Sequence, residues 1–141
     1  MVNVVCTYSL EEWKEEVVEA LSQTGKVSSV RASGPVEGDI SGQARTFYLL
    51  AYVTEKTGNY SGYTQISGHH GAREGTFLIE ETGVFDEEGA RSSMRVVPGS
   101  GIGDFKGISG TGNFVSSHGS TVKSQFELGF AERVELVGTK M

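Results

Sequence analysis

The residues best suited to chemistry in this sequence are two adjacent glutamates, Glu80 and Glu81, in an apolar run. Neighbouring side chains on a β-strand point to opposite faces, so one of the two is expected to face an apolar environment. Glu81 would share its face with Phe77 and Ile79, where desolvation would raise the pKa of its carboxyl toward that of a useful proton donor or base. The alternative is that one glutamate is solvated and the other pairs with an arginine across the sheet.

A histidine and a group of tyrosines could complete such a site. His118 precedes Gly119 at the end of a β-type run, where it could act as a general acid or base at a barrel mouth or serve as an ordinary turn residue. We predict that Glu81 and His118 transfer protons and that Tyr48 and Tyr63 orient an oxygen atom of the substrate, although ordinary β packing also explains tyrosines. The other predicted substrate contacts are Phe47, Phe77, Ile79 and Glu80, and Glu80 exchanges roles with Glu81 if the strand faces are reversed.

No metal or nucleotide site is expected. His69 and His70 are adjacent, would point to opposite faces of a strand, and form no recognised metal-ligand spacing with Cys6. The glycine-rich segment 99–112 contains no Gly-x-Gly-x-x-Gly, and no Gly-Lys-Ser/Thr or helical pattern follows it. A glycine-rich barrel corner explains that segment better than phosphate binding, so we expect no cofactor.

Only residues 9–22 show a helical pattern. Ser9 and Glu12 could form a capping box, and four apolar residues follow at helical spacing: Leu10, Trp13, Val17 and Leu21. We therefore allow at most one short N-terminal helix, and an extended chain remains the alternative.

The rest of the chain is typical of short strands joined by turns. The 20 glycines among 141 residues separate β-type runs, as at tight turns and barrel corners. The predicted strands are 2–8, 27–36, 40–54, 60–69, 75–85, 90–98, 110–118 and 120–130. In the last, apolar residues at 122, 126, 128 and 130 share one face. Eight such strands predict one all-β domain over residues 1–141, an antiparallel up-and-down β-barrel with room for side chains or one small ligand.

Composition excludes several classes of partner. The formal net charge is −6 and the basic residues are scattered, so neither nucleic acid nor an anionic membrane is expected as a partner. No apolar run reaches the roughly 20 residues of a membrane span, and residues 1–8 do not resemble a signal peptide. With one cysteine, the expected compartment is the cytoplasm. Segments 75–85 and 40–54 are apolar on both faces, which predicts a homo-oligomer, with a dimer favoured.

One segment goes beyond a general β pattern. Residues 96–114, VVPGSGIGDFKGISGTGNF, resemble the V-x-G-G-S-G-x-F-x-G-x-x-G signature of allene oxide cyclase and dirigent proteins. The wider pattern is more similar still to an uncharacterised bacterial family on that barrel. The matching pieces are 38–40, 48–52, 82–86, 96–101 and 114–119.

The resemblance implies an oligomeric, lipocalin-sized barrel of eight strands. Relatives include allene oxide cyclase, dirigent proteins and barrel cyclases that close polyketide rings, none of which needs a metal or an organic cofactor. Acidic residues are common in the bacterial family where this chain has Phe47 and Thr64, which implies a less charged lumen here.

These observations favour a cofactor-independent isomerase or cyclase that shapes a small hydrophobic substrate inside the barrel. The alternatives are a non-catalytic carrier with the same lumen and a structural barrel filled by its own side chains.

Overall fold

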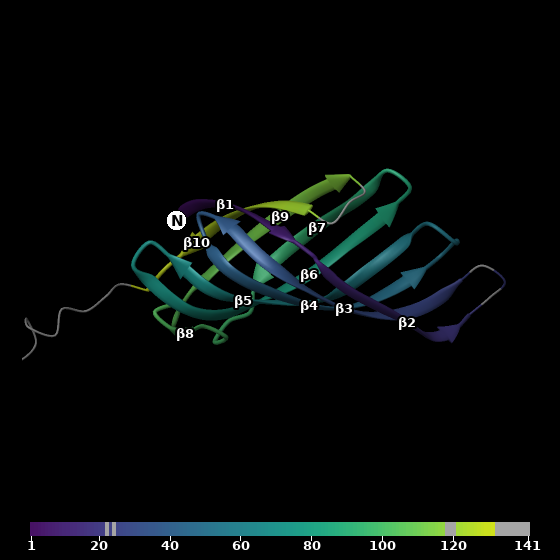
Figure 1. Cartoon of the computed structure of the whole chain (residues 1–141), viewed down its shortest axis with the longest axis horizontal. Helices are drawn as coiled ribbons and strands as arrows, with labels where there is room; N and C mark the ends of the chain where they lie inside the picture. Colours follow the sequence, from purple (N-terminus) through teal and green to yellow (C-terminus); the bar gives the residue numbers. More distant parts are fainter. Residues whose placement is uncertain (22, 24, 118–120, 132–141) are drawn as a thin grey trace, which may run out of the picture.

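The chain is built from strands alone among the residues that the structure describes, which are 1–21, 23, 25–117 and 121–131 of a computed structural model (Figure 1). Ten strands belong to one antiparallel sheet: β1 (Val2–Ser9), β2 (Glu12–Ala20), β3 (Lys26–Gly38), β4 (Ser41–Tyr52), β5 (Gly58–His70), β6 (Arg73–Asp86), β7 (Gly89–Val96), β8 (Ile102–Gly103), β9 (Ser109–Ser117) and β10 (Thr121–Gly129). The all-β prediction is confirmed. Within the described ranges, no helix is long and apolar enough to cross a membrane.

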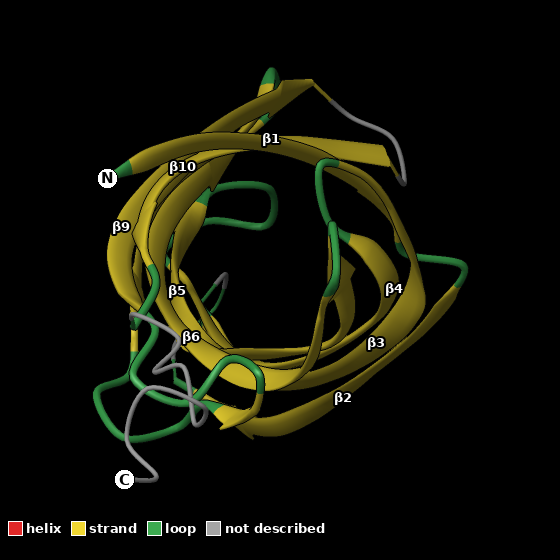
Figure 2. Cartoon of the chain, turned by 90° about the vertical axis from the view of Figure 1, so that its left-hand side faces the viewer, coloured by secondary structure: helices red, strands yellow, loops and turns green. Residues whose placement is uncertain are grey.

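Eight of the ten strands close into a barrel, which Figure 2 shows end-on as a ring. The order around the ring is β1, β10, β9, β7, β6, β5, β4 and β3. Closure depends on β1, which pairs along its whole length with β10 and through Cys6, Thr7 and Tyr8 with the end of β3. Apart from this closing pair, barrel strands lie beside their neighbours in sequence, so the predicted up-and-down barrel is confirmed.

Every second residue of the barrel strands points inward. In β6, Phe77, Ile79 and Glu81 are buried, whereas the residues between them are partly exposed. In β10 the predicted apolar face is buried at Val122, Phe126 and Leu128. Burial of each such side chain contributes about 1.5–3 kcal/mol, so this alternation fixes the register of each strand.

A loop closes one end of the barrel, on the side of β8 and the N-terminus in Figure 1. Phe105 and Ile108 of this loop are 0% and 3% exposed, and the Phe105 ring meets Phe77 edge-on at 5.2 Å between centroids. The strand β8 attaches the loop to β6. Glycine is required at Gly101, because a Cβ there would lie 1.9 Å from the Phe105 carbonyl oxygen.

Residues 9–21 contain no helix. Residues 12–20 form β2, which continues the path of β1 and pairs with the start of β3 outside the ring (Figure 2). The extended alternative is confirmed, and the apolar spacing is not two-residue because β2 extends past the barrel, where no core imposes that period. All its residues are exposed, and a bulge between Val17 and Glu19 interrupts the pairing.

Candidate functional site

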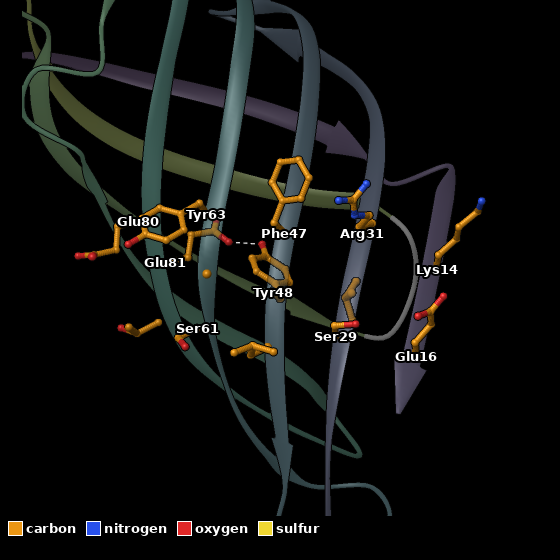
Figure 3. Close-up of a pocket in the computed structure, with 14 residues that line it drawn as sticks. Lys14, Glu16, Ser29, Arg31, Phe47, Tyr48, Ser61, Tyr63, Glu80 and Glu81 are labelled. Carbon is orange, nitrogen blue, oxygen red and sulfur yellow. Dashed lines mark hydrogen bonds between the residues drawn. The ribbon is translucent and has the colours of Figure 1, made fainter. Parts of the chain in front are cut away.

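Strand β6 carries Glu81 into the middle of the barrel, where it is 0% exposed. Tyr48 of β4 and Glu81 lie on either side of Gly62 of β5 in the paired registers. A Cβ at Gly62 would lie 2.8 Å from the Tyr48 ring, so glycine allows that ring to cross β5. The Tyr48 hydroxyl thereby donates a hydrogen bond to the Glu81 carboxyl group (Figure 3).

A second tyrosine reaches the same carboxyl group from β1. The Tyr8 hydroxyl donates to Glu81 Oε1 at 3.5 Å and accepts from the Ser124 hydroxyl at 3.0 Å. Buried Thr46 and Thr64 hydrogen bond to each other at 2.8 Å. These side chains form a polar layer across the middle of an otherwise apolar interior.

Burial raises the pKa of Glu81 from 4.5 to about 7. Hydrogen bonds from Tyr48, Tyr8 and Thr64 oppose the rise but do not cancel it. The ion pairs present elsewhere in the described residues join Arg91 to Asp86 and Arg95 to Glu80 on the outer face, and no basic side chain there pairs with Glu81. The carboxyl group can therefore hold or release a proton near neutral pH.

The neighbouring tyrosines stay protonated at neutral pH. Burial, followed by the charge of Glu81, raises the pKa of Tyr8 and of Tyr48 well above the ordinary value. Burial likewise raises the pKa of Tyr60. Three neutral phenols thus surround one titratable carboxyl group.

A cavity of about 250 Å³ occupies the open end of the barrel, above the rings of Tyr8 and Tyr48. We call it the lumen cavity. The described residues that line it are Tyr8, Leu10, Trp13, Glu15, Tyr48, Leu50, Tyr52, Tyr60, Phe85, Gly89, Ala90, Phe114, Ser116 and Val122. Half of them are aromatic, and the inward direction of those on barrel strands follows from the strand alternation, whereas Trp13 comes from β2.

Tyr60 brings one further hydroxyl group to the wall of this cavity. Its ring packs across Gly83 of β6 toward Ser92 of β7, in the same way that the Tyr48 ring packs across Gly62. A hydrogen bond with Ser92 offsets part of the rise in the pKa of Tyr60. The geometry of this contact is poor, so the Tyr60 hydroxyl is a candidate ligand contact.

Aromatic side chains also form the mouth of the cavity. Tyr52 and Phe85 pack edge-on at 5.0 Å between centroids, and the Tyr52 hydroxyl donates to the Glu15 carboxylate at 2.6 Å. Glu15 and Trp13 both come from β2, so this exposed strand supplies part of the mouth.

The predicted site residues separate into four groups. Glu81 and Tyr48 meet in the polar layer. Phe77 and Ile79 point inward as predicted, but they lie away from the lumen cavity. They fill the half of the interior next to the loop with Phe105 and Ile108, which we call the closed half. His118 lies outside the described residues.

Phe47, Tyr63 and Glu80 lie on the outer face of the sheet and cannot contact a ligand in the lumen. They line an outer groove of about 610 Å³ over β2 to β6 (Figure 3). Figure 3 shows the carboxyl groups of Glu80 and Glu81 pointing in opposite directions, and Glu80 pairs with Arg95 at 3.0 Å. The outer groove is larger than the lumen cavity, but it is a solvated surface with side chains of both charges, so the lumen is the stronger candidate.

The described residues contain no cluster suited to a metal ion. His70 stacks on Phe130 and hydrogen bonds to the Asp39 carbonyl oxygen through Nδ1 at 2.8 Å. Burial raises the pKa of the Cys6 thiol to about 12. This buried cysteine is therefore expected to stay protonated and unreactive at neutral pH.

Three tyrosine positions in the lumen were not predicted as site residues. Tyr8 follows Val4 and Cys6 at two-residue spacing, a signal that places it inside. Tyr60 and Tyr52 belong to the tyrosine-rich hairpin, and their parity follows from buried Thr64 and Tyr48 on the same strands.

Comparison with known families and structures agrees with this architecture. The model of the family described as "Protein of unknown function (DUF3224)" matches residues 4–128. A crystal structure of a protein with unknown function from the DUF3224 family of Shewanella oneidensis MR-1 is 20% identical, with a TM-score of 0.72. The alignment covers 94% of this chain and 99% of that chain. The comparison with curated proteins gives no significant match.

Proposed function

This chain belongs to the DUF3224 family, and we propose that it binds a small, largely apolar molecule with one hydrogen-bonding group inside the lumen cavity. The observation that carries the proposal is the lumen cavity itself, about 250 Å³ in volume and lined by seven aromatic residues, four of which are tyrosines with a hydroxyl group. Such a lining suits an apolar body, and a tyrosine hydroxyl can orient one polar group of the ligand.

The size of the cavity limits the ligand. A cavity of about 150 Å³ holds benzene, and drug-sized molecules occupy about 300 Å³ or more. The lumen cavity lies between these values at about 250 Å³. The ligand is therefore expected to be about as large as a two-ring aromatic compound or a short branched chain.

The test uses 2-naphthol, a flat apolar molecule with one hydroxyl group, and methyl-detected NMR. Binding is expected to shift the methyl signals of Leu50 and Val122, which line the lumen cavity. Ala90→Phe, which fills the mouth, should abolish these shifts. Ser93→Phe adds the same ring to the outer face of β7 and should leave them unchanged. Shifts that persist in Ala90→Phe, or that never involve lumen methyl groups, would contradict the proposal.

The second candidate function is a cofactor-independent isomerase or cyclase, as the resemblance to barrel cyclases suggests. It is favoured by the hydrogen bond between Glu81 and Tyr48, whose ring lines the lumen cavity. With the pKa of Glu81 near 7, Tyr48 could relay a proton between that carboxyl group and a bound carbonyl compound.

This candidate is tested with 2-tetralone, an apolar ketone that can form an enol. In D₂O the carboxylate would remove a proton next to the carbonyl, and a solvent deuteron would replace it. Faster exchange than in buffer, lost in Glu81→Gln and kept in Glu80→Gln, is the expected result. Binding without faster exchange would contradict the isomerase or cyclase function and be consistent with a carrier function.

A further inference from the structure

We infer that the ligand of the lumen cavity is an organic cation, an amine or ammonium group on a small apolar body. The inference rests on the proposed ligand-binding function and names its chemical class. It follows from the kind of ring that lines the cavity, from the charges around it and from the direction of the tyrosine protons.

The lining has the composition of an aromatic cage. Half of the described lining residues carry aromatic rings: Tyr8, Trp13, Tyr48, Tyr52, Tyr60, Phe85 and Phe114. The faces of aromatic rings attract cations, most strongly where water is excluded. The mouth already holds one cation in this way, because Lys26 Nζ lies 4.5 Å from the centre of the Tyr52 ring.

The charged lining of the cavity has one sign, and Lys26 lies outside the lining, against the Tyr52 ring. None of its described lining residues is a lysine, arginine or histidine, whereas Glu15 contributes a carboxylate at the mouth. Glu81 lies behind the rings of Tyr8 and Tyr48, buried and without a basic partner among the described residues. A buried carboxylate is unfavourable unless it is protonated or paired, and a ligand cation would supply the missing charge.

The tyrosine hydroxyls favour the same ligand. Tyr8 and Tyr48 both donate to Glu81, so each turns its only proton away from the lumen cavity. The Tyr8 oxygen already accepts from Ser124, so neither hydroxyl group offers a proton to an anionic ligand. An anionic ligand would meet these oxygen atoms and the carboxyl group with the same sign of charge.

Cation binding is then coupled to the protonation of Glu81. The titratable groups that face this carboxyl are Tyr8, Tyr48 and Tyr60, all neutral at pH 6–8 because burial raises their pKa values. Glu81, with a pKa of about 7, is the group that changes charge in this range. The affinity for a cation should rise from pH 6 to pH 8, with a proton released to solvent on binding.

Three probes of nearly the same shape test the inference by methyl-detected NMR titration. Choline is positive, 3,3-dimethylbutan-1-ol is neutral and 3,3-dimethylbutanoate is negative. At pH 8 we expect choline to bind at least tenfold more tightly than the alcohol, with no detectable binding of the carboxylate. Equal affinity for choline and the alcohol would overturn the cation inference.

Paired variants separate charge from shape. Glu81→Gln should reduce the choline-to-alcohol affinity ratio at least threefold at pH 8 and remove its pH dependence. Glu80→Gln, on the outer face, should leave both unchanged. An unchanged ratio in Glu81→Gln would contradict the assigned role of the carboxyl group.

Failure of this inference and failure of the proposed function give different results. If the alcohol or 2-naphthol shifts the lumen methyl signals and choline does not, the cavity binds neutral ligands and only the cation assignment is wrong. If none of these probes shifts lumen methyl signals, the proposed function fails with it.

Discussion

The two halves of the barrel interior are made from the same strands but are filled in different ways. The closed half contains apolar side chains, and Phe105 and Ile108 of the loop between β7 and β9 complete it. The open half places three tyrosines around Glu81 and keeps a cavity of about 250 Å³. Apolar side chains fill the closed half, whereas the open half keeps a cavity.

This difference indicates how the fold divides its tasks. The open half contains features that lower stability, namely a buried carboxyl group and a Tyr60 hydroxyl without a hydrogen bond of acceptable geometry. Such features persist where function requires them and the rest of the molecule supplies enough stability. The closed half is therefore expected to carry stability, and the open half specificity.

The largest expected effect is in the closed half. Phe105→Ala should lower the free energy of unfolding by about 3–5 kcal/mol, because it leaves a cavity against Phe77. Urea denaturation followed by circular dichroism measures the change. Ile102→Ala in the same loop, where the side chain is 66% exposed, should change it by less than about 0.5 kcal/mol. Similar losses in the two variants would remove the contrast between the halves.

The next largest expected effect is the pH dependence of the free energy of unfolding, which is assigned to Glu81 in the open half. Its pKa rises from 4.5 to about 7 on folding, so the folded state holds the proton more tightly than the unfolded state. The contribution of Glu81 to the free energy of unfolding is therefore greatest below pH 4.5. It falls by roughly 3 kcal/mol in total as the pH rises to about 7. Glu81→Gln should remove that slope, whereas Glu80→Gln should keep it. Parallel profiles for wild type and Glu81→Gln would show that this carboxyl group does not titrate inside the barrel.

Two tyrosine variants sharpen the comparison within the open half. Tyr48→Phe removes a donor to Glu81 and should lower the free energy of unfolding by about 1–3 kcal/mol. Tyr60→Phe removes a hydroxyl whose contact with Ser92 has poor hydrogen-bond geometry, so it should change stability by less than about 1 kcal/mol or increase it. Thermal unfolding of both proteins at pH 8 is the measurement. A larger loss in Tyr60→Phe would mean that its hydroxyl makes a stabilising hydrogen bond after all.

The smallest effect on stability is expected at the mouth. Trp13 is 49% exposed on β2, so Trp13→Ala should lower the free energy of unfolding by less than about 1 kcal/mol. The same change should weaken 2-naphthol binding severalfold, because the indole lines the lumen cavity. Val17→Ala on the same strand, outside the lining, is the matched control for binding. Equal binding by Trp13→Ala and wild type would exclude β2 from the site.

Most of the fold could be predicted from alternation because the barrel wall has one buried face. Val122, Phe126 and Leu128 show this, since one register alone puts all three inside. β2 lacks that constraint, so the spacing of Trp13 and Val17 matched a helix by chance.

The centre of the site was predictable and its periphery was not. Glu81 follows two apolar residues of the same parity, which fixes its direction. Tyr63 had no such guide, because its strand has few apolar residues and glycine at Gly62. Tyr48 reaches the carboxyl group only by crossing that glycine, a contact between three strands that spacing along one strand does not reveal.

Closure of the ring by β1 and β10 has a consequence for synthesis of the chain. Val2 pairs with Leu128, so β1 leaves the ribosome long before the partner strand to which it must bond. At about 5–20 residues per second, the wait lasts on the order of ten seconds. The meander from β3 to β7 can form during translation, while Tyr8 has only its short contact with β3. A nascent chain stalled before residue 121 is therefore expected to lack hydrogen-exchange protection in β1, and the ligand site is expected to form only once β10 is available.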